Sequence, residues 1–153
     1  MERLTLIDKS SWYTGPWQSE PDLCRWMDFL TGLPCVIARD ARSGAWCGYV
    51  GIPSTHPLYH TYAADPTFNY ISIHGGVSFT GFLPTQELWI TPAQRRWWIG
   101  FDCMKEFDLQ PLKLDEDDEL IDPRVEYRDE TYVQHEAMYL AEQLDMMEGR
   151  QDD

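Results

Sequence analysis

The chain has 153 residues, of which 43% are hydrophobic, and a formal net charge of −14. A chain of this length can bury one proper core, so we expect residues 1–153 to form a single domain. The negative charge argues against direct binding to nucleic acid and to anionic membranes, because both attract Lys and Arg.

The first third of the chain predicts one helix and then a β-hairpin. Apolar residues at helical spacing, with acids before them and Gly32 after them, predict a helix near residues 20–31. The β-branched run at 35–38 and the apolar run at 46–52 predict two strands. The polar segment 40–44 ends in glycine and predicts the turn between these strands.

The middle of the chain predicts further strands. Three prolines within residues 53–66 indicate a surface loop. Side chains alternate between two faces over residues 67–74, which predicts a strand, and the glycine pair 75–76 predicts a tight turn before a returning strand at 77–82. With a last aromatic strand at 95–102, the expected fold is α+β: an antiparallel β-meander of four to five strands, packed by the helix near 20–31 and by a C-terminal helix.

The C-terminal part of the chain carries most of the charge. Residues 114–153 contain fifteen Asp or Glu and three Arg, whereas residues 1–113 contain eleven acids and nine bases. Five consecutive acids at 115–119 cannot pack together, so residues 113–124 are expected to form an exposed acidic connection.

An amphipathic helix is expected at residues 130–148. Apolar residues recur there at intervals of four and three: Val133, Ala137, Leu140, Leu144 and Met147. Asp129 is a suitable N-cap, and Gly149 can end the helix. The opposite face of this helix is acidic.

No metal or other cofactor is expected. The cysteines are separated by ten or more residues, so no close pair supplies half of a zinc site: Cys24, Cys35, Cys47 and Cys103. No apolar run approaches the roughly 20 residues of a membrane span, and the first ten residues lack the pattern of a secretory signal. We therefore expect a cytoplasmic protein with free thiols. His56 and His60 have the spacing of a helical metal pair, but Pro57 lies between them and no third ligand is evident.

Three motifs resemble a family of small uncharacterised proteins from bacteriophages and prophages. They are His-Gly-Gly-Val-Ser-Phe at 74–79, Trp-Trp-Ile-Gly-Phe-Asp-Cys at 97–103 and Tyr-Arg-Asp-Glu-Thr-Tyr-Val at 127–133. The resemblance implies a phage-borne accessory protein but supplies no mechanism. A histidine is expected in the family two positions after the Asp-Cys pair; this chain has Lys105 there and keeps the later Asp108.

His74, Asp102 and Cys103 form the most enzyme-like set in the sequence. A histidine can move a proton, a carboxylate can orient it, and a thiolate can attack. Each residue lies at an expected strand end, so one sheet edge could gather them into an enzyme site or a nucleotide site. The alternative is structural: His74 anchors a turn through its ring, Asp102 accepts from backbone amides of the next loop, and Cys103 is buried.

Two tryptophans follow two arginines at residues 95–98. Neighbouring side chains of a strand point to opposite faces, so Trp97 and Trp98 cannot share one core. The second ring either packs under another element or, as an exposed ring, contacts a partner.

The acidic end suggests binding to a basic partner. Carboxylates on a rigid helix could steer association with a groove rich in Arg and Lys and compete with nucleic acid for it. The leading hypothesis is a non-catalytic phage protein that inhibits a host defence or nucleic-acid-processing complex, as anti-CRISPR proteins do. The expected contact residues are Asp115, Glu116, Asp117, Asp118, Glu119, Glu136, Glu142, Asp145 and Trp98. A solvated charged surface without a partner, and a homo-oligomer built on exposed aromatic residues, remain alternatives.

Overall fold

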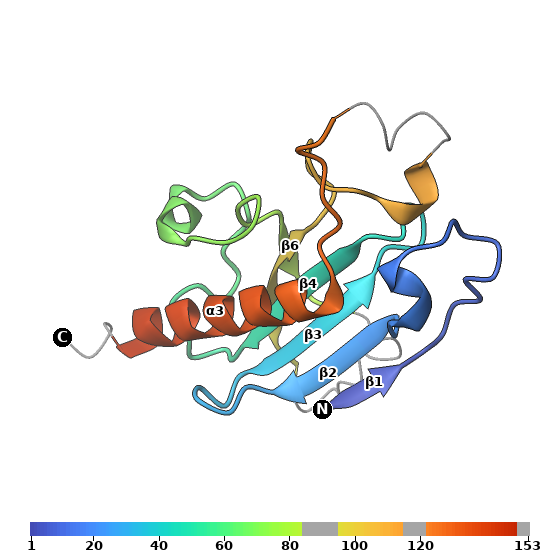
Figure 1. Ribbon diagram of the computed structural model, residues 1–153. Coiled ribbons are helices and arrows are strands. Elements are labelled where there is room, and N and C mark those ends of the chain that lie inside the picture. Colours follow the sequence, from blue (N-terminus) through green and yellow to red (C-terminus); the bar gives the residue numbers. More distant parts are fainter. Residues whose placement is uncertain (84–94, 115–121, 150–153) are drawn as a thin grey trace.

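The computed structural model describes residues 1–83, 95–114 and 122–149 (Figure 1). Its strands form one six-stranded antiparallel sheet in the order β1-β2-β3-β4-β6-β5. The strands are β1 (Glu2–Leu4), β2 (Leu23–Met27), β3 (Pro34–Arg39), β4 (Trp46–Ile52), β5 (Phe79–Gly81) and β6 (Trp97–Asp102). Short 3-10 helices are η1 (Pro16–Ser19), η2 (Pro66–Tyr70) and η4 (Pro111–Lys113). Within the described residues, α3 (Glu130–Gly149) is the one α-helix, and no helix is long and apolar enough to cross a membrane.

The α+β class is confirmed, with six strands instead of four to five. Strands β3, β4 and β6 lie where the sequence predicts them, and α3 matches the helix expected at 130–148. Asp129 caps α3 as expected, because its carboxylate accepts a hydrogen bond from the Tyr132 amide at 2.8 Å. The edge strand β1 has only three residues and was not predicted.

The helix predicted near residues 20–31 is wrong. Residues Leu23–Met27 form β2, which pairs with both β1 and β3. The chain turns sharply after β2, because the Asp28 carboxylate accepts hydrogen bonds from the amide and hydroxyl of Thr31 and Gly32 adopts a φ of 72°. This local turn and pairing on both sides override the helical spacing of the apolar residues.

The strand predicted at residues 67–74 is also wrong. The chain forms η2 there, because Pro66 begins a helical turn and the Asp65 carboxylate accepts from the Thr67 amide at 2.9 Å. The returning strand expected at 77–82 is present only as the shorter β5.

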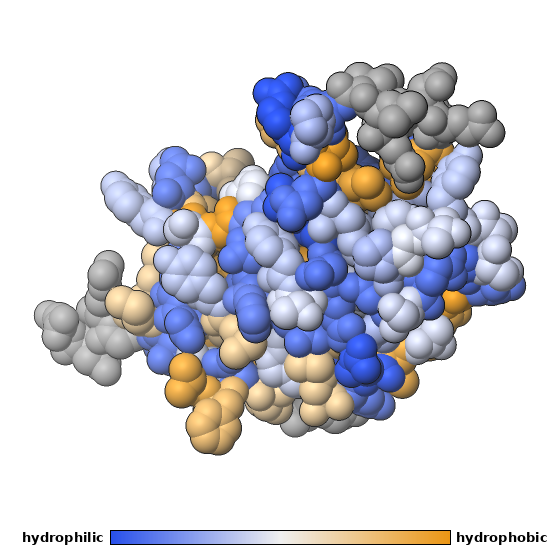
Figure 2. Space-filling model, viewed as in Figure 1, coloured by the Kyte–Doolittle hydropathy of each residue, from blue (hydrophilic) through white to orange (hydrophobic). Residues whose placement is uncertain are grey.

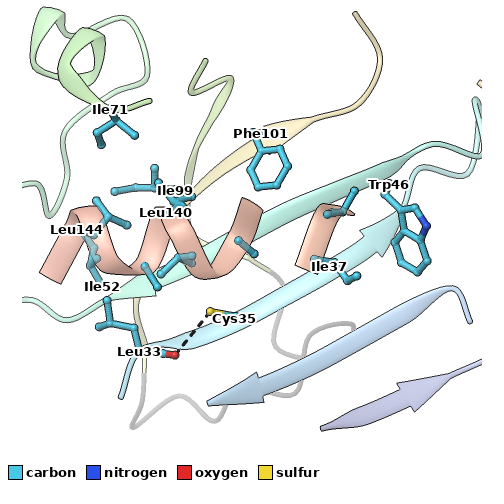
Figure 3. Close-up of a cluster of buried hydrophobic side chains, with 14 of the residues drawn as sticks. Leu33, Cys35, Ile37, Trp46, Ile52, Ile71, Ile99, Phe101, Leu140 and Leu144 are labelled. Atoms are coloured by element: carbon cyan, nitrogen blue, oxygen red, sulfur yellow. Dashed lines mark hydrogen bonds between the residues drawn. The ribbon is translucent and has the colours of Figure 1, made fainter. Parts of the chain in front are cut away.

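The core lies between the sheet and α3, which crosses β3 and β4 (Figure 1). The inward side of α3 has no exposed surface at Val133, Ala137, Leu140, Ala141 and Leu144. These side chains meet the strand residues of one sheet face, including Ile37, Ile52 and Ile99 (Figure 3). Because the helix is apolar only on this side, its other side faces outward as a rigid surface.

A buried ion-pair cluster attaches the N-terminal segment to the sheet, and a partly exposed ion pair attaches the start of α3. The Asp22 side chain, 2% exposed, accepts hydrogen bonds from Lys9 Nζ at 2.5 Å and from Arg39 Nε at 3.0 Å. It also accepts from two backbone amides at 2.7 and 2.8 Å. Glu130, the first residue of α3, is paired with Arg3 at 2.7 Å. The strand network therefore fixes where the helix begins.

These carboxylates predict a loss of stability in acid. Burial alone would raise the pKa of Asp22, but Lys9, the two amides and Arg39 together hold this pKa below its ordinary value. Arg3 is the largest cause of the lowered pKa of Glu130. Groups with lowered folded-state pKa values stabilise the fold above their unfolded pKa, about 4, and this contribution is lost as the pH falls. The free energy of unfolding should be nearly constant above about pH 5 and fall below about pH 4. Urea unfolding across this range measures it, and equal stability in neutral and acidic buffer would contradict the expectation.

Candidate functional site

His74, Asp108 and Tyr132 form a hydrogen-bonded chain that joins three distant segments of the sequence. Nε2 of His74 lies 2.9 Å from Asp108 Oδ2, and Nδ1 lies 2.8 Å from the Tyr132 hydroxyl. Asp108 also accepts from Arg128 Nε and from the Lys105 amide, both at 3.0 Å. The Asp108 side chain is 2% exposed and that of His74 13%, so the cluster lies just below the surface.

The partners of Asp108 assign the proton positions. Ionised Asp108 only accepts hydrogen bonds, so Nε2 of His74 carries the proton between them. When Nδ1 carries no proton, it accepts from the Tyr132 hydroxyl. Phenol, imidazole and carboxylate thus stand in the order of nucleophile, base and orienting group. However, burial, followed by the charge of Glu136, raises the pKa of Tyr132, which keeps the phenol protonated and disfavours nucleophilic attack.

Two glycines allow the turn that follows His74. Gly75 and Gly76 have φ values of 68° and 78°, which side chains rarely adopt, and a Cβ on Gly75 would lie 2.7 Å from the Lys105 side chain. The tight turn expected here is confirmed. The His74 amide donates to Glu136 on α3 at 3.0 Å, so both the backbone and the ring of His74 are tied to the helix.

The structure does not join His74 to Asp102 and Cys103 as an enzyme set. Asp102 shares a sheet face with Trp98, since alternate strand residues face the same side, whereas His74 contacts α3 on the other side. Asp102 accepts from the Met104 amide at 3.0 Å and from Lys105 Nζ at 3.2 Å. Cys103 is 2% exposed, and burial raises the pKa of its thiol. The contacts are those of the structural alternative.

Sequence reasoning missed the actual partners of His74. Asp108 drew attention only through the phage-family resemblance, and Tyr132 only as part of a motif. Their separation from His74 is 34 and 58 residues, so no local spacing connects them. The available signal was that two motifs of the resemblance contain His74 and Tyr132, and that Asp108 lies five residues after the third motif, at 97–103.

His56 and His60 do not form a metal pair. His56 is buried, with Nδ1 accepting from the Leu58 amide at 3.0 Å and Nε2 bonded to the Leu144 carbonyl at 2.7 Å. Nε2 therefore holds α3, and Nδ1 holds the backbone of the loop that contains His56. His60 stacks on Tyr59 instead, with ring centroids 4.5 Å apart. In the part of the chain that the structure describes, no group of three His, Cys, Asp or Glu could hold a metal ion.

Trp97 and Trp98 enter two different cores. Trp97 packs on the α3 side, where its indole NH donates to the Thr61 carbonyl at 3.0 Å. Trp98 packs on the opposite face with Leu23 and Val36 and is 1% exposed. A side chain this buried does not reach a partner, so Trp98 belongs to the core and not to a contact surface.

Most described acids near the start of α3 are already neutralised. Glu130 pairs with Arg3, Glu126 with Arg128 at 3.1 Å, and Asp122 with Arg124 at 2.9 Å. Glu136 accepts from the His74 amide and is committed to the cluster described above. The run from Asp115 to Glu119 lies outside the described residues. The expected acidic surface is therefore tested only on the helix.

The outer face of α3 combines acidic and apolar side chains. We define it by Met138, Tyr139, Glu142, Asp145 and Met146. Met138, Tyr139 and Met146 are 37%, 46% and 61% exposed. Among the described residues, neither Glu142 nor Asp145 has an ion-pair or hydrogen-bond partner. Figure 2 shows hydrophilic and hydrophobic surface alternating along the helix.

Comparisons with models of protein families, with curated proteins and with solved structures found no match to this chain.

Proposed function

We propose that this is a non-catalytic binding protein whose outer face of α3 contacts a basic protein. The partner is a host defence or nucleic-acid-processing complex in the cytoplasm of the infected cell, as the phage-family resemblance implies. The observation that carries the proposal is the set of exposed Met and Tyr side chains beside two carboxylates without internal partners.

Several physical features support this choice of surface. The helix is fixed by a fully buried stripe, so the backbone positions from which its outer side chains project are fixed relative to the sheet. Exposed apolar side chains that gather beside charges are typical of contact surfaces, and Met and Tyr are enriched there. Carboxylates without internal partners lose no ion pair when a basic surface approaches, and they steer its association.

The enzyme alternative receives less support from the geometry. Both nitrogens of the His74 ring and both carboxylate oxygens of Asp108 are hydrogen-bonded within the protein, and the raised pKa of Tyr132 opposes its activation. These contacts connect the 66–78 loop, the segment after β6 and the start of α3. Such a cluster stabilises the platform from which α3 presents its outer face.

The test begins with affinity capture from the bacterial host and continues with binding kinetics on the captured protein. Asp145→Asn should slow association about two- to fivefold at low salt, which corresponds to the energy of an exposed charge pair, and should flatten the salt dependence. Glu106→Gln is the matched control, because Glu106 is also an exposed acid but lies in the 103–110 loop and not on the outer face. Equal effects of both substitutions, or none, would show that the outer face does not bind the partner.

A further inference from the structure

The turn between β2 and β3 carries two strongly exposed apolar side chains, one of which, Phe29, is the most exposed large hydrophobic residue among the described residues. Phe29 is 97% exposed and Leu30 is 70% exposed. We call these two residues the Phe29-Leu30 tip. Figure 2 shows hydrophobic surface where Figure 1 places this turn. Nothing in the sequence-based hypotheses uses the tip, because that segment was expected to be helical.

A second turn in the same sheet shows that the fold does not need apolar residues there. In the 28–33 turn, Gly32 donates to the Asp28 carbonyl, and the Asp28 carboxylate holds the amide and hydroxyl of Thr31. In the 40–45 turn, Gly44, Asp40 and Ser43 repeat these bonds with distances between 2.8 and 2.9 Å.

The glycines of the two turns have nearly the same φ, 72° and 76°. The two positions that project from the second turn hold Ala41 and Arg42, both exposed. Small and charged residues therefore satisfy the same backbone geometry. Phe29 and Leu30 contribute exposed apolar surface that this turn does not require, and such surface marks a contact site.

The tip lies at the end of the molecule where the outer face of α3 carries its charge. Leu33, which ends the turn, belongs to the same core cluster as Ile52 and Leu144, and Figure 3 shows these three side chains close together. Leu144 directly precedes Asp145 and Met146 on the outer face. An apolar projection and an acidic, partly apolar helix face thus share one end of the protein.

We infer that the Phe29-Leu30 tip is an apolar anchor that inserts into a hydrophobic pocket bordered by Lys or Arg on a protein partner. The inference rests on the proposed function, since the acids of the outer face supply the complementary charge. A second copy of this chain fits poorly, because two molecules of net charge −14 repel each other, and an anionic membrane is repelled likewise. Central aromatic and aliphatic anchors in pockets carry most of the binding energy of an interface, while rim charges set the association rate.

The test uses a synthetic amphipathic peptide of leucine and lysine as a probe that is both apolar and basic, with a leucine and glutamate peptide as its counterpart. The intact protein should bind the lysine peptide only. The double substitution Phe29→Ala and Leu30→Ala should weaken this binding roughly 10- to 30-fold, the range of an anchor residue, mainly through faster dissociation. Arg42→Ala, at the matched position of the second turn, should not weaken it. Both variants should keep the unfolding midpoint of the parent protein, because they change exposed positions.

The outcomes of this experiment distinguish a failure of the tip as an anchor from a failure of the outer face as a binding surface. If Asp145→Asn weakens binding of the lysine peptide and the tip variant does not, the anchor is wrong and the proposed function stands. If the tip variant alone weakens binding, the anchor stands and the acidic face is wrong. Failure of the intact protein to bind, binding to phosphatidylcholine vesicles that the tip variant abolishes, or self-association through the tip in light scattering would each overturn the inference.

Discussion

Replacing Asp22 with asparagine is expected to lower the free energy of unfolding by about 3–5 kcal/mol, the usual loss when one partner of a buried ion pair is removed. Lys9 is 5% exposed at its side chain and Arg39 has no exposed side-chain surface. The substitution keeps the shape of the side chain but removes its charge. Arg39 retains other acceptors, including Glu20, whereas Lys9 has Asp22 as its one ion-pair partner among the described residues.

Urea unfolding of four variants checks this expectation: Asp22→Asn, Lys9→Met, their combination, and Glu2→Gln. Glu2→Gln is the control, because Glu2 is half exposed and forms a surface pair with Arg25, and its unfolding midpoint should match that of the parent protein. Combining Asp22→Asn with Lys9→Met should recover part of the loss, since the double variant no longer buries a cation without a partner. A double variant as unstable as the sum of both single changes would show that Lys9 and Asp22 do not act as a pair.

The strands with consistent local signals could be predicted from the sequence. Segments 35–38, 46–52 and 95–102 are rich in β-branched or aromatic residues; the first two lie in strands of the sheet, and the third forms β6 from Trp97 onward. The helix at 130–148 has a long stripe of apolar residues, a capping Asp129 and no competing turn signal. In these segments the propensity, the periodicity and the tertiary packing agree.

The wrong helix prediction at residues 20–31 could have been avoided with a pattern that the sequence contains. The pattern Asp, two residues, Ser or Thr, and Gly occurs at 28–32 and again at 40–44, and both occurrences form the same turn. The second was identified as a turn because the segment 40–44 is polar and ends in glycine. The first was assigned to the end of a helix, because Leu23, Trp26, Met27 and Leu30 happen to follow helical spacing. Using the second turn as a template for the first would have divided the segment correctly.

The candidate site was less accessible to sequence reasoning. Strand β5 precedes β6 in the chain but lies outside it, at the edge of the sheet. This order and the loop before β5 carry His74 to the start of α3, and neither is encoded in a local pattern. Asp102 was chosen as the partner of His74 because it ends a predicted strand. Side-chain alternation along β6 instead sends Asp102 to the face opposite α3.

Replacing Asp108 with alanine is expected to cost about 2–4 kcal/mol of stability, because it removes a buried acceptor that serves several donors. The ring of His74, the Arg128 guanidinium and the Lys105 amide all lose a hydrogen bond. Glu126→Gln is the matched control, because Glu126 also forms an ion pair with Arg128. The Glu126 side chain is 70% exposed, so this substitution should have little effect on stability.

The same variant also tests whether this cluster supports the fold or performs chemistry. If it supports the fold, Asp108→Ala should lower the unfolding midpoint, and the affinity of the remaining folded protein for the leucine and lysine peptide should not change. The reason is that the cluster contacts α3 through Tyr132 and Glu136, neither of which belongs to the outer face that begins at Met138. A normal midpoint for Asp108→Ala would mean that His74, Asp108 and Tyr132 do not stabilise the fold, and a catalytic or ligand-binding role would then explain their arrangement better.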